Sequence, residues 1–208
     1  DLSFPELIRE IEVDPTLCDI DCIDCEEACP LNLITVTVHT PDGKEIRPEE
    51  AKSLPNKEDL KVKVDIKKNL SPCCRLCEMK CLKGAIQVRK IMHGILRINL
   101  EKCPTDCQDC LDVCPIPGAL YLDESDNKVH PNETFCVFCG VCKIVCPVEE
   151  ALILERKMIR HTPVSSGAWN KALEKLTSTK EYSKEAKAKA LTKTQKMVEK
   201  ILLPKEAS

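Results

Sequence analysis

The chain has 208 residues, a net charge of −3, only 3% aromatic residues and 14 prolines. With so few aromatic side chains and so many prolines, one large hydrophobic core is not expected, and small modules wrapped around bound cofactors are favoured. No apolar run approaches the roughly 18 residues that a transmembrane helix needs, so no membrane insertion is predicted.

Cysteine is the dominant feature of the sequence, because all 16 cysteines fall into four groups of four. The four motifs read "CDIDCIDCEEACP", "CCRLCEMKC", "CPTDCQDCLDVCP" and "CVFCGVCKIVCP". Their cysteines are Cys18, Cys22, Cys25 and Cys29; Cys73, Cys74, Cys77 and Cys81; Cys103, Cys107, Cys110 and Cys114; and Cys136, Cys139, Cys142 and Cys146. Every motif ends in C-x2-C-x3-C, and only the spacing between its first two cysteines varies.

The repeat extends beyond the thiols. Four residues before the first cysteine of each motif stands Asp14, Asn69, Asn99 or Asn132, and a short apolar run follows each last cysteine. Each unit is therefore predicted to be a strand, a thiol loop, a short helical turn and a strand, and such internal repeats define the architecture.

The segment 30–72 joins the first two motifs and interrupts the repeat. It begins with "VTVHTPDGKEI", which predicts a strand, a Pro-Asp-Gly turn and a return strand. A loop with a short helix is expected over 47–60, and the alternation of "KVKVDI" (61–66) predicts a half-buried strand.

The connections between the later motifs are shorter. Residues 85–99, between motifs two and three, are predicted to form a hairpin with its turn near His93-Gly94. Residues 119–132, between motifs three and four, are predicted to form a second hairpin with a polar tip.

The C-terminal part is predicted to be helical over 165–203, with Ser165 or Ser166 as the N-cap and Pro204 beyond its end. The helix has an apolar stripe on one side and lysines on the other. The apolar stripe is expected to dock either on the chain's own modules or on a partner subunit. Residues 156–208 carry 13 basic and 5 acidic side chains, against 18 and 29 in residues 1–155. Without interleaved aromatic residues or a recognition motif, this basic tail does not predict nucleic-acid binding.

Three kinds of chemistry use four thiols in so short a loop. Disulfides are disfavoured, because thiols only three residues apart in all four motifs suit bridge geometry poorly. Structural zinc sites take two C-x2-C pairs separated by a longer loop, which is not the spacing here. The run C-x2-C-x2-C-x3-C-P is the bacterial two-cluster ferredoxin signature, so all 16 cysteines are predicted to ligate four [4Fe–4S] clusters.

On these motifs the chain resembles the archaeal polyferredoxins, which carry ferredoxin modules of two [4Fe–4S] clusters along one polypeptide. The resemblance covers residues 10–156. It implies an α+β fold of tandem ferredoxin-like modules, at 1–95 and 96–160, with a helical extension at 161–208.

The tail "RHTPVSSGAWNKALEKL" (160–176) resembles a narrower group, the polyferredoxin subunit of formylmethanofuran dehydrogenase. In that complex methanogens reduce CO2 to a formyl group. The resemblance implies other oxidoreductase subunits as partners. Members of that group usually carry more than four motifs, which indicates a fragment or a short form.

In a two-cluster module the last cysteine of one motif serves the other cluster. Sequential pairing, motif one with two and three with four, is the first choice, and a nested arrangement of one with four and two with three is the alternative. Sequential pairing predicts four ligand sets: Cys18, Cys22, Cys25 and Cys81; Cys73, Cys74, Cys77 and Cys29; Cys103, Cys107, Cys110 and Cys146; and Cys136, Cys139, Cys142 and Cys114.

The second motif departs from the pattern, because Cys73 and Cys74 are adjacent and Leu82 replaces the proline. Ligation by all four thiols through a distorted loop is favoured. There are two alternatives. One of the two adjacent thiols is spare and the site has three ligands and an exchangeable iron, or the departure shifts the potential of that cluster.

No catalytic site is predicted. The histidines His39, His93, His130 and His161 are scattered, and six glycines supply no phosphate loop. The expected function is therefore electron transfer along the clusters to a partner oxidoreductase, in the reducing cytoplasm of an anaerobe. The alternatives are a subunit of a hydrogenase or heterodisulfide reductase complex, or a scaffold whose clusters only hold the fold.

Overall fold

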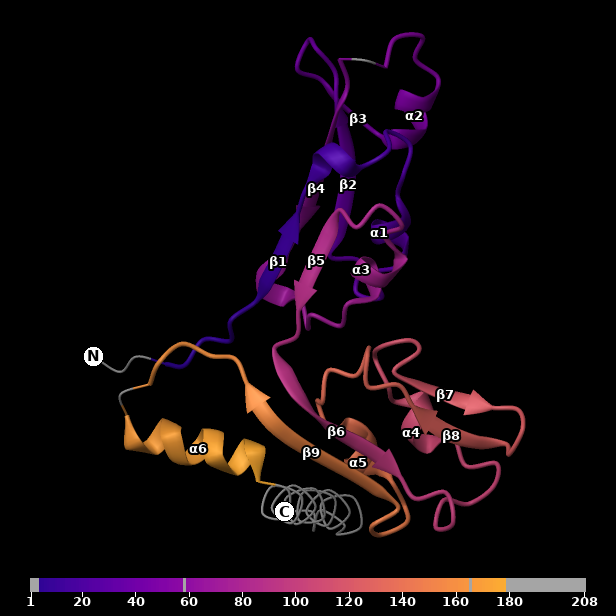
Figure 1. Ribbon diagram of the computed structural model, residues 1–208, viewed down its shortest axis with the longest axis vertical. Helices are drawn as coiled ribbons and strands as arrows, with labels where there is room; N and C mark the ends of the chain where they lie inside the picture. Colours follow the sequence, from indigo (N-terminus) through magenta and orange to yellow (C-terminus); the bar gives the residue numbers. More distant parts are fainter. Residues whose placement is uncertain (1–3, 58, 165, 179–208) are drawn as a thin grey trace, which may run out of the picture.

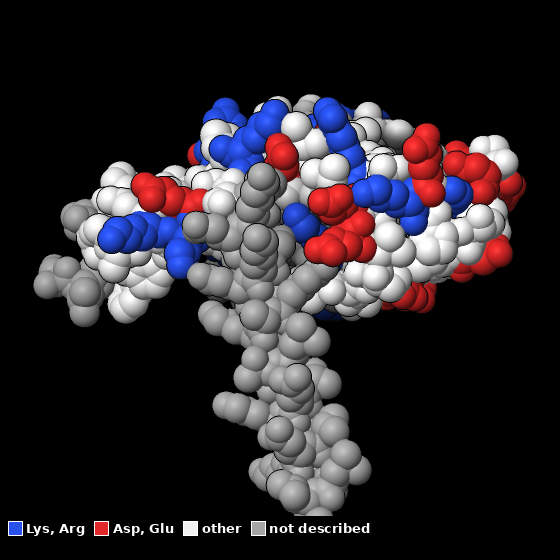
Figure 2. Space-filling view, turned by 90° about the horizontal axis from the view of Figure 1, so that it is seen from below, with Lys and Arg blue, Asp and Glu red and all other residues white. Residues whose placement is uncertain are grey.

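The computed structural model describes residues 4–57, 59–164 and 166–178. Figure 1 shows an elongated molecule in which the first half of the chain lies above the second half. Basic and acidic side chains are interspersed on the face seen in Figure 2.

The first half contains five strands and five short helical segments. In chain order these are β1 (Glu10–Val13), η1 (Pro15–Leu17), α1 (Asp24–Glu27), β2 (Ile34–His39), β3 (Glu45–Ile46), α2 (Pro48–Lys52), β4 (Lys61–Ile66), η2 (Lys68–Leu70), α3 (Leu76–Lys80) and β5 (Ile86–Arg89). Strand β1 pairs antiparallel with β5, and a second sheet has the order β3-β2-β4. The predicted strand–turn–strand at 36–46, the short helix after it and the strand at 61–66 are all confirmed.

The second half repeats this plan without the insertion. Its elements are β6 (Met92–Ile98), α4 (Asp109–Asp112), β7 (Leu120–Asp123), β8 (Lys128–Pro131), α5 (Val141–Val145), β9 (Leu152–Ile159) and α6 (Gly167–Thr177). Strand β6 pairs antiparallel with β9, as β1 does with β5, and β7 pairs with β8, as β2 does with β4. The predicted hairpin at 119–132 and the α+β class are therefore confirmed.

The predicted hairpin at 85–99 is wrong. Strand β5 pairs with β1 and strand β6 pairs with β9, so the chain passes from one half to the other between them. Gly94 marks a bulge in β6, where an added Cβ would lie 2.0 Å from the Glu155 carbonyl oxygen. Glycine is needed here because two backbones approach closely. From the sequence alone, a glycine with this role cannot be told from a glycine in a turn.

Three chain segments meet where the halves join. The Ile8 N–H donates to the Arg160 carbonyl at 3.0 Å, and the Arg160 N–H donates to the Ile91 carbonyl at 2.8 Å. The Thr162 N–H donates to the Glu6 carbonyl at 2.9 Å. The N-terminal segment and the end of β9 therefore lie side by side at the junction, as Figure 1 shows.

The buried core is built from small aliphatic side chains and thiols. Val36, Val38 and Val129 are essentially fully buried, and the half-cores also contain Cys25 and Cys142. Cys74 belongs to the first half in sequence, yet it packs in the core of the second half with Cys136. Thiols therefore supply part of the contact between the halves.

Helix α6 lies along β9 (Figure 1). The N-cap of α6 is Ser166, which is one of the two positions predicted for it. The apolar stripe predicted at 186–202 lies outside the described residues. Within the described ranges, no helix combines the length and apolarity needed to cross a membrane.

Candidate metal centres

Each thiol loop starts from the same backbone contact with the strand that follows the partner loop. The four contacts are Asp14 N–H to the Ala85 carbonyl (2.8 Å), Lys67 to Leu33 (2.9 Å), Asn99 to Ala151 (2.7 Å) and Asn132 to Ala119 (2.8 Å). In the second motif, the residue that makes this backbone contact is therefore Lys67, and not Asn69 as the sequence repeat indicated. The loops of each half are tied reciprocally, and their helices pack together, α1 with α3 and α4 with α5.

The thiols are interleaved between the two loops of each half. One cavity is lined by Cys18, Cys22, Cys25 and Cys81. A second is lined by Cys29, Cys73, Cys74 and Cys77, and a third by Cys114, Cys136, Cys139 and Cys142. Cys146 lies within electrostatic range of Cys103 and Cys110. This grouping agrees with the sequential arrangement and differs from the nested one.

The space between the thiols of the Cys18 site suits a group larger than one ion, whereas the cavities at the Cys29 and Cys114 sites measure about 20 Å³ each. In the part of the chain that the structure describes, no three cysteine, histidine or carboxylate side chains converge to hold a single metal ion. The cavity between Cys18, Cys22, Cys25 and Cys81 measures about 90 Å³, whereas one water molecule needs roughly 10–15 Å³. Four soft thiol donors around such a space fit an iron–sulfur cubane.

Burial makes the third thiol of every motif hard to ionise in the protein alone. It raises the pKa of Cys25 and Cys110 to about 11, and that of Cys77 and Cys142 to about 12. Neighbouring thiols add to these pKa shifts by charge repulsion. A ligand thiol must lose its proton, so bound iron would have to offset this cost.

Several thiols are hydrogen-bonded by backbone N–H groups. The Leu33 N–H donates to Cys29 Sγ at 3.3 Å, and the Phe138 N–H donates to Cys136 Sγ at 3.4 Å. Such bonds to ligand sulfur are among the features that set a cluster's potential.

Carboxylates brace the helices of the first half. Glu26 follows Cys25, accepts the Val36 N–H at 2.8 Å and pairs with Arg47 at 2.9 Å. The hydrogen bond from Arg47 is the main cause that lowers the pKa of Glu26. Glu78 follows Cys77 in the same way and accepts the Val88 N–H at 3.3 Å.

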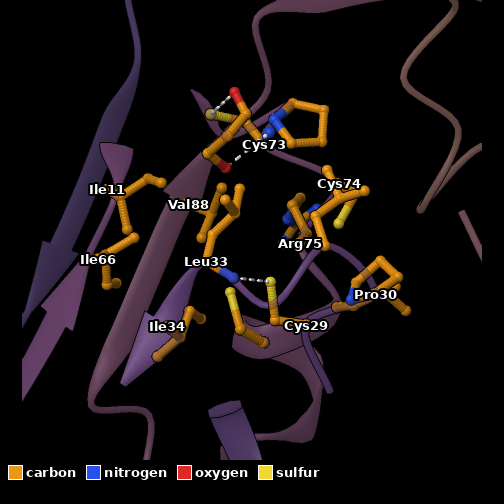
Figure 3. A pocket seen from close by; sticks show the side chains of 15 residues that line it. Ile11, Cys29, Pro30, Leu33, Ile34, Ile66, Cys73, Cys74, Arg75 and Val88 are labelled. Atoms are coloured by element: carbon orange, nitrogen blue, oxygen red, sulfur yellow. Dashed lines mark hydrogen bonds between the residues drawn. The ribbon is translucent and has the colours of Figure 1, made fainter. Parts of the chain in front are cut away.

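The second motif differs from the other three in its first thiol. Cys73 is 1% exposed, and its Sγ lies 4.0 Å from the Ser71 carbonyl oxygen. Figure 3 shows this thiol turned away from those of Cys29 and Cys74. Ser71 lines the same cavity, although the ligand sets predicted from the sequence contain cysteines alone. The signal was present, since "SPCCRLCEMKC" reads S-x2-C-x2-C-x3-C.

Lys90 lies between the two halves. Its side chain is mostly buried, lies 5.2 Å from the centre of the Phe138 ring and donates to the Glu133 carbonyl. Cys136 and Cys74 are among the groups that act on its charge, although desolvation is the larger effect and lowers the pKa of Lys90. A cation therefore stands between thiols of both halves.

The comparisons with known proteins agree with this chemistry. Residues 95–147 match the 4Fe-4S dicluster domain family. The chain is 34% identical over 86 residues to the polyferredoxin-like subunit of an aliphatic sulfonate oxidoreductase from Pyrococcus furiosus, covering 36% of this chain and 47% of that one. It is 33% identical over 87 residues to formate hydrogenlyase subunit 2 of Escherichia coli, covering 36% and 39%. The match with this chain therefore spans less than half the length of each of these two relatives.

A solved structure extends the likeness over most of the fold. A chain of the formate dehydrogenase–heterodisulfide reductase–formylmethanofuran dehydrogenase complex from Methanospirillum hungatei superposes with a TM-score of 0.67 at 29% identity. The match covers 84% of this chain and 59% of that chain. The predicted resemblance to polyferredoxins and the binding of [4Fe–4S] clusters are thereby confirmed.

Proposed function

We propose that this chain, a polyferredoxin-like protein with a 4Fe-4S dicluster domain at 95–147, carries electrons along four [4Fe–4S] clusters within a larger oxidoreductase complex. The observation that carries the proposal is the interleaving of the thiol loops. In each half, the last thiol of one loop lies with the earlier thiols of the other loop, so each half would hold two clusters. The division into modules at 1–95 and 96–160, with an extension at 161–208, is part of this proposal.

A bound [4Fe–4S] cluster supplies a one-electron couple, and the chain's part is to hold it and tune it. The thiols of each set would hold the iron, and the backbone N–H donors at Cys29 and Cys136 would stabilise charge on sulfur. Burial of the third thiols excludes water from one side of each site. Together, the thiol ligands, the backbone donors and the burial would allow one small protein to hold several clusters.

The contact between the halves supports an order for the clusters. Cys74 packs in the core of the second half with Cys136, and Lys90 lies beside both. We infer that these two sites are the inner pair. The sites beginning at Cys18 and Cys103 would then be the outer ends, where electrons enter and leave.

The partner that we propose is a formylmethanofuran dehydrogenase complex of methanogenesis. The M. hungatei complex supports this choice, because the likeness covers most of the fold at 29% identity. The likeness to formate hydrogenlyase subunit 2 supports a hydrogenase-type complex as the alternative. Free thiols in such number suit a reducing compartment, for which we propose the cytoplasm.

Metal analysis and redox titration test the proposal together. Protein purified anaerobically is expected to contain about 16 iron and 16 acid-labile sulfide per chain, if each site is a cubane. Electron paramagnetic resonance (EPR) should show reversible one-electron reduction. Zinc without sulfide would refute the clusters, whereas clusters that resist reduction would favour the structural scaffold. Companion subunits co-purifying from native cells would identify the complex.

A further inference from the structure

Backbone geometry aligns the second and fourth motifs without a gap. Residue Arg75 precedes α3 with φ of 70° and Gly140 precedes α5 with φ of 87°. Cys73, two residues before Arg75, has φ of 55°, and Phe138, two residues before Gly140, has φ of 53°. A positive φ is uncommon outside glycine, so two matched pairs identify equivalent positions. Cys73 is therefore the counterpart of Phe138.

Burial and contacts agree with this alignment. Cys73 and Phe138 are 1% and 2% exposed, so both fill a buried position behind the loop. The Cys73 N–H donates to Ser71 Oγ at 3.1 Å, just as the Phe138 N–H donates to Cys136 Sγ at 3.4 Å. Ser71 therefore presents its side-chain oxygen where Cys136 presents its sulfur.

The loop anchors lead to the same residue independently. The four equivalent anchors are Asp14, Lys67, Asn99 and Asn132. Four residues beyond each stands Cys18, Ser71, Cys103 or Cys136. The second motif is thus a complete copy of the common loop, in which serine replaces the first cysteine and an additional cysteine occupies a buried position.

We propose that Ser71, and not Cys73, supplies the fourth protein ligand at the site formed by Cys74, Cys77 and Cys29, so that one iron there has an oxygen ligand. This proposal differs from the expectation that all four thiols of the motif bind iron. It rests on the proposed function, because the site must hold a cluster. Cys73 then packs the loop as Phe138 does.

The position of Ser71 allows it to act in this way. Ser71 lines the cavity together with Cys29, Cys73, Cys74 and Cys77, and the Arg9 Nε donates to the Ser71 carbonyl oxygen at 3.0 Å. A serine hydroxyl must lose its proton to replace a thiolate, so bound iron would have to offset that cost, as it does for the thiols. The serine ligand would belong to one of the two proposed inner clusters, where the halves meet.

Variants of the full-length protein with reconstituted clusters test the assignment. Ser71→Ala is expected to lose about one of the 16 iron atoms per chain and to show the EPR signal of a three-iron cluster when oxidised. Ser71→Cys should retain all the iron. Cys73→Ala, or Cys73→Val where alanine leaves the loop underpacked, should retain the wild-type iron content and spectrum. Cys136→Ser, which places the same ligand in the other half, provides the matched control and should remain a four-iron site.

Two results would overturn the assignment. One is loss of iron and a three-iron signal in both Cys73 variants, and the other is an unchanged iron content in Ser71→Ala. Failure of the proposed function looks different, because wild-type protein would then lack acid-labile sulfide altogether. Far-UV circular dichroism of each variant separates loss of a ligand from loss of the fold.

Discussion

Cysteines at equal spacing play different parts once the chain is folded. The third thiol of each motif has a raised pKa and is buried, or half-buried in the case of Cys77, whereas Cys139 is exposed. The last thiol of each motif leaves its own loop and faces the partner loop. The role of a cysteine therefore depends on its place in the loop pair as well as in its motif.

Exchange of the last cysteines is tested by Cys146→Ala. Because Cys146 lies with Cys103 and Cys110, we expect the variant to convert that site to a three-iron form and to leave the site of Cys136, Cys139 and Cys142 intact. EPR and an anomalous iron difference map would identify the altered site. The reciprocal control is Cys114→Ala, which should damage the Cys136 site instead. Damage confined in both variants to the loop that carries the substitution would contradict the interleaving.

At the scale of elements, local signals were sufficient for some features and insufficient for others. The Pro-Asp-Gly turn and the polar tip at 123–128 predicted the β2–β3 and β7–β8 hairpins, because adjacent strands pair through a turn that the sequence encodes. The partners of β5 lie 73–79 residues away and those of β6 54–67 residues away, so no local pattern specified them, and the predicted hairpin was wrong. Ser71 was missed for another reason: its spacing fits the motif, but its residue type does not.

The bulge at Gly94 provides a test of the β6–β9 pairing. Gly94→Ala would place a Cβ 2.0 Å from the Glu155 carbonyl oxygen, so one strand must move. We expect a loss of about 1–3 kcal/mol in the free energy of unfolding, measured by urea denaturation. Gly167→Ala is the control, because nothing lies within 4 Å of the added Cβ; it should change stability by at most about 1 kcal/mol. A Gly94→Ala protein as stable as the wild type would show that β6 does not approach β9 this closely.

The whole molecule is two similar halves joined end to end, and the contacts between the halves lie at the junction. The N-terminal segment, Ile91 and the end of β9 are tied there by backbone hydrogen bonds. Cys74, Lys90 and Phe138 fill the space between the thiol loops of the two halves. If electrons cross the molecule through the proposed clusters, they would pass this contact, where the buried Lys90 lies near Cys74 and Cys136.

Lys90 is therefore the residue through which the junction can be tested. Its ammonium lies near Cys74 and Cys136, and a positive charge stabilises the reduced, more negative cluster. We expect Lys90→Met to lower the reduction potentials of the two inner clusters by tens of millivolts, where ~59 mV corresponds to a tenfold change in a one-electron equilibrium. Redox titration followed by EPR would measure the shift.

Two further variants separate charge from packing. Lys90→Arg keeps the charge and should retain most of the wild-type potentials, even if the contact with Phe138 changes. Lys44→Met removes an exposed charge on the β2–β3 turn and should leave every cluster potential unchanged, because water screens it. If Lys90→Met assembles all its clusters with wild-type potentials, the cation does not act on them, and the inner sites must lie elsewhere. A negative shift in Lys90→Met that Lys90→Arg does not share would instead place the charge between the two inner clusters, at the point where the halves exchange electrons.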